Sequence, residues 1–238
     1  NRIPSSDGWR ALSVSLVHLS HAKVTSGYPE AFTPWLRWLP DGTFGVEVFF
    51  VISGFIITYL MLKEREKSDT VSLGNFYTRR AIRILPAYFV FLLVVLVLTF
   101  ITQFHLAPSQ WIRVLTFTSN YGWDGPGGGI PWPVAHLWSL SIEEQFYLLW
   151  PLAFLLAVGK KFHPTKLILI CMIPILISPV ARVVSYLELS DSIALSNFSF
   201  LLRGDSIAWG CILAIVFVSR GKWLDEFVRK HRVLIAMF

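Results

Sequence analysis

Two residues near the start of the sequence have the types and the spacing for a site in which one transfers a proton and the other binds an anion. Arg10 and His21 are eleven residues apart, so on an α-helix they project from one face, about 16 Å apart. Histidine is the usual proton-transfer side chain near neutral pH. His18 lies one turn away on a neighbouring face. The alternative interpretation is that the histidines lie at a membrane interface and Arg10 extends to the surface.

A second group of residues is suited to binding phosphates. Arg79, Arg80 and Arg83 stand just ahead of a strongly apolar block that begins at Ile84. Guanidinium groups can grip phosphate through two parallel hydrogen bonds, so we expect an anion site here. The alternative is a topology signal with lipid head-group contacts.

A third group combines carboxylates with other polar side chains at helical spacing. It consists of His136, Ser139, Glu143 and Tyr147, with Glu144 beside Glu143. Adjacent carboxylates near the end of an apolar block indicate a functional site, although acidic residues also favour solvated helix N-termini.

Other polar and small residues inside apolar blocks predict packing. Gly45, Ser53 and Gly54 would allow close helix contact, and Glu47 among them should face protein or a cavity. Arg203 and Asp205 are expected in a mutual or interhelical ion pair. Cys171 and Cys211 are interpreted as small buried residues, and no metal site is expected because no CxxC or HExxH pattern occurs.

These residues must be positioned by membrane-spanning helices. The mean hydropathy is +0.58, with 54% apolar and 15% charged residues, against roughly a quarter charged in soluble domains. The apolar residues form blocks near the ~20 residues that span a bilayer, which predicts an all-α, polytopic transmembrane helix bundle. About six full spans are expected, at residues 9–23, 44–62, 84–104, 137–158, 167–187 and 198–218. Between the third and fourth, residues 103–136 could form a re-entrant or interfacial segment.

Charge asymmetry orients these spans. Alternate loops are rich in basic residues, and the loops between them are poor. The positive-inside rule then places the N-terminus and the basic loops in the cytoplasm, with Arg10 near that surface and His21 deeper. It also explains the net charge of +6 without a nucleic-acid partner.

The sequence has features of a fragment. It starts at Asn1 rather than Met, and a seventh apolar block begins near Val233. We expect residues 1–238 to form one integral-membrane domain that is incomplete at its C-terminus.

Four motifs in order resemble the acyltransferase 3 family of membrane acyltransferases. They are an Asp-Gly-x-Arg with a later His, a Gly-Val-x-x-Phe-Phe-x-x-Ser-Gly-Phe, an Arg-Arg-x-x-Arg-Ile-x-Pro and a His-x-Trp-Ser-Leu-x-x-Glu-x-x-Phe-Tyr. In this sequence they start at Asp7, Gly45, Arg79 and His136.

The resemblance implies transfer of an acyl group, often acetyl from acetyl-CoA, to a carbohydrate or lipid-linked glycan hydroxyl in the cell envelope. Catalytic roles are expected for His21, as general base or acyl carrier, and for Glu143, which could orient His21 or contact the acceptor. Donor binding is expected for Arg10, Arg79, Arg80 and Arg83. Acceptor binding is expected for His136, Ser139, Glu144 and Tyr147.

The expected location is the plasma membrane of a bacterium, and acyl-CoA is expected as a substrate rather than a resident cofactor. Lipopolysaccharide, peptidoglycan, exopolysaccharide or a small metabolite could be the acceptor. The rival interpretations are a transporter or channel, which would have paired repeats of broken helices, and an export partner without catalysis. The sequence contains no such repeats, and both Arg10 and His21 are present.

Overall fold

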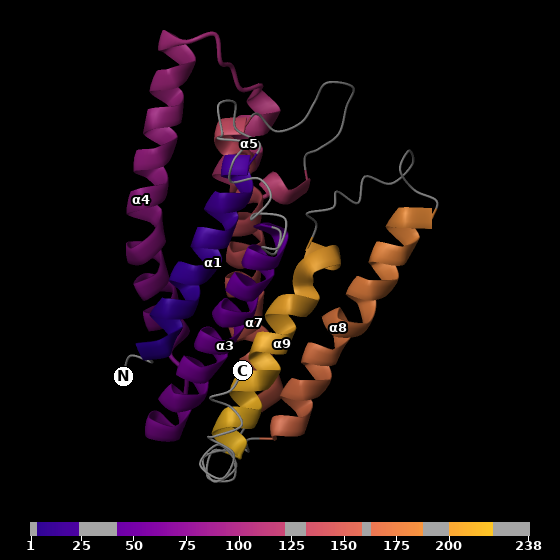
Figure 1. Ribbon diagram of the computed structural model, residues 1–238. Coiled ribbons are helices and arrows are strands. Elements are labelled where there is room, and N and C mark those ends of the chain that lie inside the picture. Colours follow the sequence, from indigo (N-terminus) through magenta and orange to yellow (C-terminus); the bar gives the residue numbers. More distant parts are fainter. Residues whose placement is uncertain (1–3, 24–41, 122–131, 159–162, 188–199, 221–238) are drawn as a thin grey trace. The chain divides into compact units, whose positions relative to one another are not determined.

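The computed structural model describes residues 4–23, 42–121, 132–158, 163–187 and 200–220, which form helices joined by turns, with no strand in these ranges (Figure 1). The all-α prediction is confirmed. The elements are α1 (Pro4–Lys23), α3 (Gly42–Ser68), α4 (Leu73–Ile101), α5 (Pro108–Leu115), the 3-10 helix η2 (Ser119–Tyr121), α6 (Trp132–Ala135), α7 (Leu137–Val158), α8 (Pro164–Leu187) and α9 (Phe200–Ser219).

Five of the described helices are long and apolar enough to cross a membrane. They cover Gly42–Ser68, Leu73–Ile101, Pro133–Val158, Pro164–Ser185 and Phe200–Ser219. The expectation of six full spans was one too high, because α1 does not meet this criterion; its polar residues, such as Arg10, Ser13 and His18, interrupt the apolar sequence. The seventh block near Val233 lies outside the described residues.

The chain divides into two compact units. One comprises Asn1–Lys63, Ala157–Leu176 and Arg203–Phe238, and the other comprises Glu64–Leu156 and Ile177–Leu202. The expectation of a single domain over residues 1–238 stays a prediction.

In the first unit, α3 and α9 cross in direct backbone contact. A Cβ atom on Gly54 would collide with the carbonyl oxygen of Ile207, and one on Gly210 with the carbonyl oxygen of Val51. A Cβ on Gly45 would lie 2.8 Å from the carbonyl oxygen of Ser13 in α1. The predicted packing role of the small residues in α3 is therefore confirmed.

The same crossing carries an ion pair. Nη1 of Arg203 in α9 donates a hydrogen bond of 2.7 Å to Oε1 of Glu47 in α3. The expected interhelical ion pair of Arg203 is confirmed, and Glu47 is its partner.

In the second unit, α4 starts well before the expected Ile84. Ser72 caps the helix, since its side chain accepts a hydrogen bond from the Asn75 N–H, and Leu73 is the first helical residue. The arginines 79, 80 and 83 consequently lie inside the helix rather than ahead of it. At 29 residues, α4 is about 43 Å long, more than the ~30 Å hydrocarbon core requires.

The segment after α4 folds back along that helix. The hydroxyl of Tyr88 donates a 2.6 Å hydrogen bond to the carbonyl of Val114, and the Tyr88 and Phe117 rings stack at 4.7 Å. Tyr88 lies about 20 Å along the axis from Ile101, where α4 ends. The segment that contains α5 and η2 therefore packs against the middle of α4, and its re-entrant or interfacial position in the membrane stays a prediction.

Candidate functional site

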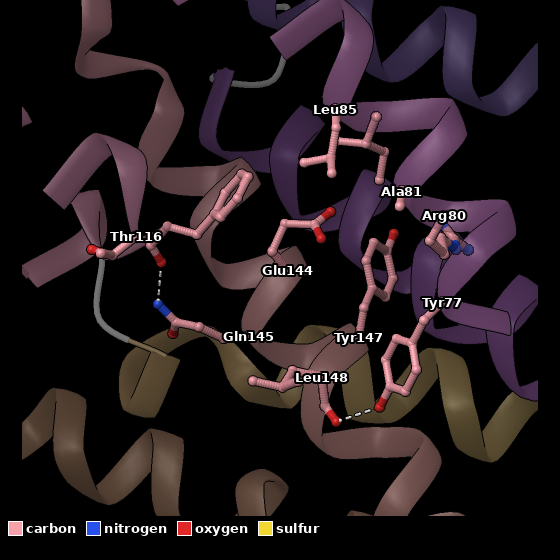
Figure 2. Close-up of a pocket in the computed structure, with 11 residues that line it drawn as sticks. Tyr77, Arg80, Ala81, Leu85, Thr116, Glu144, Gln145, Tyr147 and Leu148 are labelled. Atoms are coloured by element: carbon pink, nitrogen blue, oxygen red, sulfur yellow. Dashed lines mark hydrogen bonds between the residues drawn. The ribbon is translucent and has the colours of Figure 1, made fainter. Parts of the chain in front are cut away.

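A pocket of about 300 Å³ opens in the second unit between α4, α7 and the residues that follow α5 (Figure 2). Its lining is mostly apolar, with a small number of polar groups, as is usual for small-molecule sites. The lining residues are Tyr77, Arg80, Ala81, Ile84, Leu85, Thr116, Phe117, Glu144, Gln145, Tyr147 and Leu148.

Helical periodicity brings these side chains to one place. Glu144, Tyr147 and Leu148 are three and four residues apart on α7, so they share a face, and Tyr77, Arg80 and Ala81 do the same on α4. The hydroxyl of Tyr77 donates a 3.0 Å hydrogen bond to the carbonyl of Leu148, which fixes the two helices to each other beside the pocket. Figure 2 shows Glu144 and Tyr147 both reaching from α7 towards Ala81 and Leu85.

Arg80 brings a positive charge to this pocket. Its guanidinium carbon lies 4.1 Å from the centre of the Tyr147 ring and 5.9 Å from that of Phe76. These cation–π contacts stabilise the positive charge over two aromatic rings. Arg79 instead forms a 3.3 Å ion pair with Glu64, and Arg83 is exposed outside the pocket lining.

Glu144 brings an unsatisfied acceptor. Its Oε1 is buried and receives no hydrogen bond from the described part of the chain. A buried acceptor without a donor is costly, so a ligand hydroxyl or N–H placed here would gain a strong interaction. The pocket thus presents a carboxylate and a guanidinium that both line one small cavity.

The other residues expected on α7 lie elsewhere. Glu143 is buried, at 6% exposure, but does not line the pocket. His136 is exposed and contacts Phe91 edge-on at 5.3 Å, and the Ser139 hydroxyl donates to the carbonyl of His136. Among the expected acceptor-binding residues, the structure therefore brings Glu144 and Tyr147 into the pocket, and not His136 or Ser139.

Sequence reasoning did not single out Tyr77, Phe117 or Gln145. Gln145 stands next to Glu144 in the polar stretch, and Phe117 belongs to an aromatic run from Trp111 to Tyr121. Their importance depends on contacts between residues far apart in the sequence, so no local spacing pattern could have indicated it.

Arg10 and His21 lie on α1, in the first unit. Nδ1 of His21 donates a 2.8 Å hydrogen bond to the carbonyl of Val17, and Nδ1 of His18 donates one of the same length to Val14. These contacts assign the proton of each neutral ring to Nδ1, because a carbonyl oxygen can only accept. Arg10 is half-buried, and its Nε has no hydrogen-bond partner among the described residues. That Glu143 orients His21 stays a prediction.

Cys171 in α8 and Cys211 in α9 are both buried free thiols, as expected for small packed residues. Within the described ranges, no group of three or more His, Cys, Asp or Glu residues could hold a metal ion.

Comparisons with a family model and with known proteins both identify acyltransferases as relatives of this chain. Residues 3–238 match the model of a family described as an acyltransferase domain. The chain is 32% identical over 232 residues to the peptidoglycan O-acetyltransferase OatA of Listeria monocytogenes, covering 90% of this chain and 34% of the relative. It is also 32% identical over 223 residues to the O-acetyltransferase OatA of Staphylococcus aureus, covering 90% of this chain and 35% of that protein. The chain therefore spans about a third of the length of these relatives. No solved structure matches significantly.

Proposed function

This chain belongs to the acyltransferase family, and on that premise we propose that it transfers an acetyl group from acyl-CoA to a hydroxyl of a cell-envelope glycan. The observation that carries the proposal is the pocket in which Arg80 stacks on Tyr147 while Glu144 keeps a buried oxygen to which no described residue donates a hydrogen bond. Acyl transfer to a sugar needs a positively charged group and a hydrogen-bond acceptor. The positive group faces the polarised carbonyl or the anionic phosphates of the donor, and the hydrogen-bond acceptor binds the sugar hydroxyl.

The reaction is proposed as a direct transfer. Nε2 of His21 takes the proton from the acceptor hydroxyl, whose oxygen forms a bond to the acyl carbon as the carbon–sulfur bond to CoA breaks. The proton then passes to the leaving thiolate. Within the second unit, Glu144 is proposed to receive a hydrogen bond from the acceptor, and Arg80 to face the acyl carbonyl or the donor phosphates, with Arg79 and Arg83 as further donor contacts.

A peptidoglycan-type polymer is the proposed acceptor, because the Listeria relative bears that name. The protein is proposed to lie in the plasma membrane of a bacterium with its N-terminus in the cytoplasm. In that orientation, a membrane-impermeant thiol reagent added from outside should label a cysteine placed at Gln103 and not one placed at Ser68. The reverse labelling would overturn the orientation.

The test of function is transfer in proteoliposomes that contain the purified product of the whole gene. With labelled acetyl-CoA and a soluble glycan fragment, label should appear in the glycan as an alkali-labile ester. Glu144→Gln should lower kcat/KM at least about 100-fold, the range for loss of a positioned charged group at a reaction centre. Glu66→Gln, at an exposed position near the end of α3, is the matched control. Transfer that survives in Glu144→Gln would contradict the role of this pocket.

A further inference from the structure

One wall of the pocket is held in an unfavourable backbone conformation. Phe117 has a φ of 53°, in the left-handed region that residues with a side chain rarely adopt. Such strain persists only where surrounding contacts impose it, and it is concentrated at functional sites. The contacts that hold Phe117 therefore indicate what the conformation serves.

Two contacts from different helices hold this residue. Its ring stacks on Tyr88 of α4, with 4.7 Å between centroids and 25° between planes. Its carbonyl accepts a 2.8 Å hydrogen bond from Nε2 of Gln145 in α7. The ring and the backbone are thus fixed independently of each other.

Gln145 is itself held by a reciprocal amide pair. Its Nε2 also donates a 2.8 Å hydrogen bond to Oδ1 of Asn120, and Nδ2 of Asn120 donates one of 3.3 Å to Oε1 of Gln145. Asn120 is fully buried, so its amide would be costly to leave unpaired, and the bonds to Gln145 satisfy it. Gln145 and Asn120 form a clamp, which fixes the segment after α5 to α7.

The clamp is adjacent in the sequence to the site carboxylate. Glu144 and Gln145 are neighbours, and both line the pocket together with Phe117. The open space of about 300 Å³ between the lining side chains has to hold both the acyl group and the reacting hydroxyl of the acceptor, and Phe117 bounds it on one side. The position of the Phe117 wall therefore decides how long an acyl chain can enter.

We propose that Phe117 is the residue that restricts the acyl donor to acetyl, and that Gln145 positions it through its carbonyl. This inference rests on the proposed function, since it requires the acyl group to enter this pocket. In the intact protein, acyl chains longer than acetyl meet the Phe117 ring. Discrimination by one methylene in an apolar pocket is typically about 10- to 200-fold.

The experiment measures kcat/KM for acetyl-, propionyl- and butyryl-CoA with the whole gene product in proteoliposomes. Phe117→Ala should raise the butyryl-to-acetyl ratio at least about tenfold. Phe117→Gly should do the same, and glycine adopts the left-handed backbone without strain, so this variant protects the test against misfolding. Phe89→Ala is the matched control, because Phe89 also contacts the Tyr88 ring, at 6.2 Å, but does not line the pocket.

Gln145→Met tests the positioning role. It should shift the ratio in the same direction as Phe117→Ala, and the double variant should shift it no further, since both changes act on one wall. A residue that only stabilised the fold would lower all three rates alike and leave the ratio unchanged. If Gln145→Met does not fold, Asn120→Ala, which removes the acceptor that orients Gln145, takes its place.

The outcomes distinguish a failure of this inference from a failure of the proposed acyl-transfer function. If the unmodified protein transfers no acyl group from any acyl-CoA, the proposed function fails. If it transfers acetyl, and both Phe117 variants keep its acyl selectivity, Phe117 does not set chain length and the inference is overturned. If the Phe117 variants shift the ratio and the clamp variants do not, the role of Gln145 is overturned.

Discussion

The two units each contain an arginine and a glutamate within membrane-spanning helices, and the two pairs are arranged differently. In the first unit, Arg203 and Glu47 make a direct hydrogen bond of 2.7 Å across the contact between α3 and α9. In the second, Arg80 lies against the Tyr147 ring, and Glu144 has a buried oxygen to which no described residue donates.

The difference separates charges that are paired within the protein from charges that could bind a ligand. A charge inside a membrane is costly, and a direct partner removes most of that cost, so the Arg203–Glu47 pair is complete without a ligand. An aromatic face stabilises Arg80 without occupying its N–H groups, which leaves both it and Glu144 able to bind another molecule. The arrangement of charges, and not their presence in a span, therefore indicates the site.

The largest expected effect on the transfer rate comes from His21 in the first unit. His21→Ala should lower transfer on the order of 10²- to 10⁴-fold, the usual loss with a general base, while the protein still inserts and binds donor. His18→Ala should be mild. The two histidines have the same local hydrogen bond, so activity in glycan acetylation assays must separate them. Loss with His18→Ala and not with His21→Ala would reverse the assignment.

The glycine crossing should be the most sensitive structural feature of the first unit. Gly210→Ala places a Cβ against the carbonyl of Val51, and a backbone obstacle cannot rotate away. The expected loss is about 3 kcal/mol of stability, at the upper end for overpacking, measured by thermal unfolding in detergent. Gly74→Ala, where nothing lies within 4 Å of the added Cβ, should instead be neutral or stabilising by up to about 1 kcal/mol. Equal effects at the two glycines would contradict the tight crossing.

The three arginines of α4 should differ in their importance. Arg80→Lys keeps the charge but loses the flat guanidinium that stacks on Tyr147, so KM for acetyl-CoA should rise about tenfold. Arg83→Lys, at an exposed position, should have the smaller effect. Titration of acetyl-CoA against both purified variants checks this order. A larger effect at Arg83 would favour the sequence-based expectation of a donor site outside the pocket.

The smallest expected effect tests whether the Arg203–Glu47 pair is only structural. Arg203→Met should lower stability by about 1–2 kcal/mol, between the values for exposed and buried pairs. Adding Glu47→Met should recover most of this loss, because no unpaired carboxylate remains. The donor KM should stay constant throughout the cycle. If the donor KM rises in Arg203→Met and recovers when Glu47→Met is added, this pair also takes part in donor binding.

Local patterns predicted the helices well and their ends less well. The α7 bounds agree with the expected 137–158, and the continuously apolar residues from Phe146 onwards define the second half of this helix. The start of α4 was missed because its first turns carry arginines and small polar residues, which hydropathy does not count as part of a span. The residues Arg80, Glu144 and Tyr147 were predicted individually, but not their meeting in one pocket. That meeting depends on pairs such as Tyr77 with Leu148, which are 71 residues apart.

The clamp on Phe117 also sets an order for the assembly of the protein at the ribosome. The Gln145 side chain that holds Phe117 lies 28 residues later in the chain. At a synthesis rate of about 5–20 residues per second, Phe117 is made roughly 1.4 to 6 seconds before its partner. During that interval the segment after α4 has no hydrogen bond from α7 to hold its left-handed turn. The pocket is therefore completed only after α7 has been made and packed against this segment.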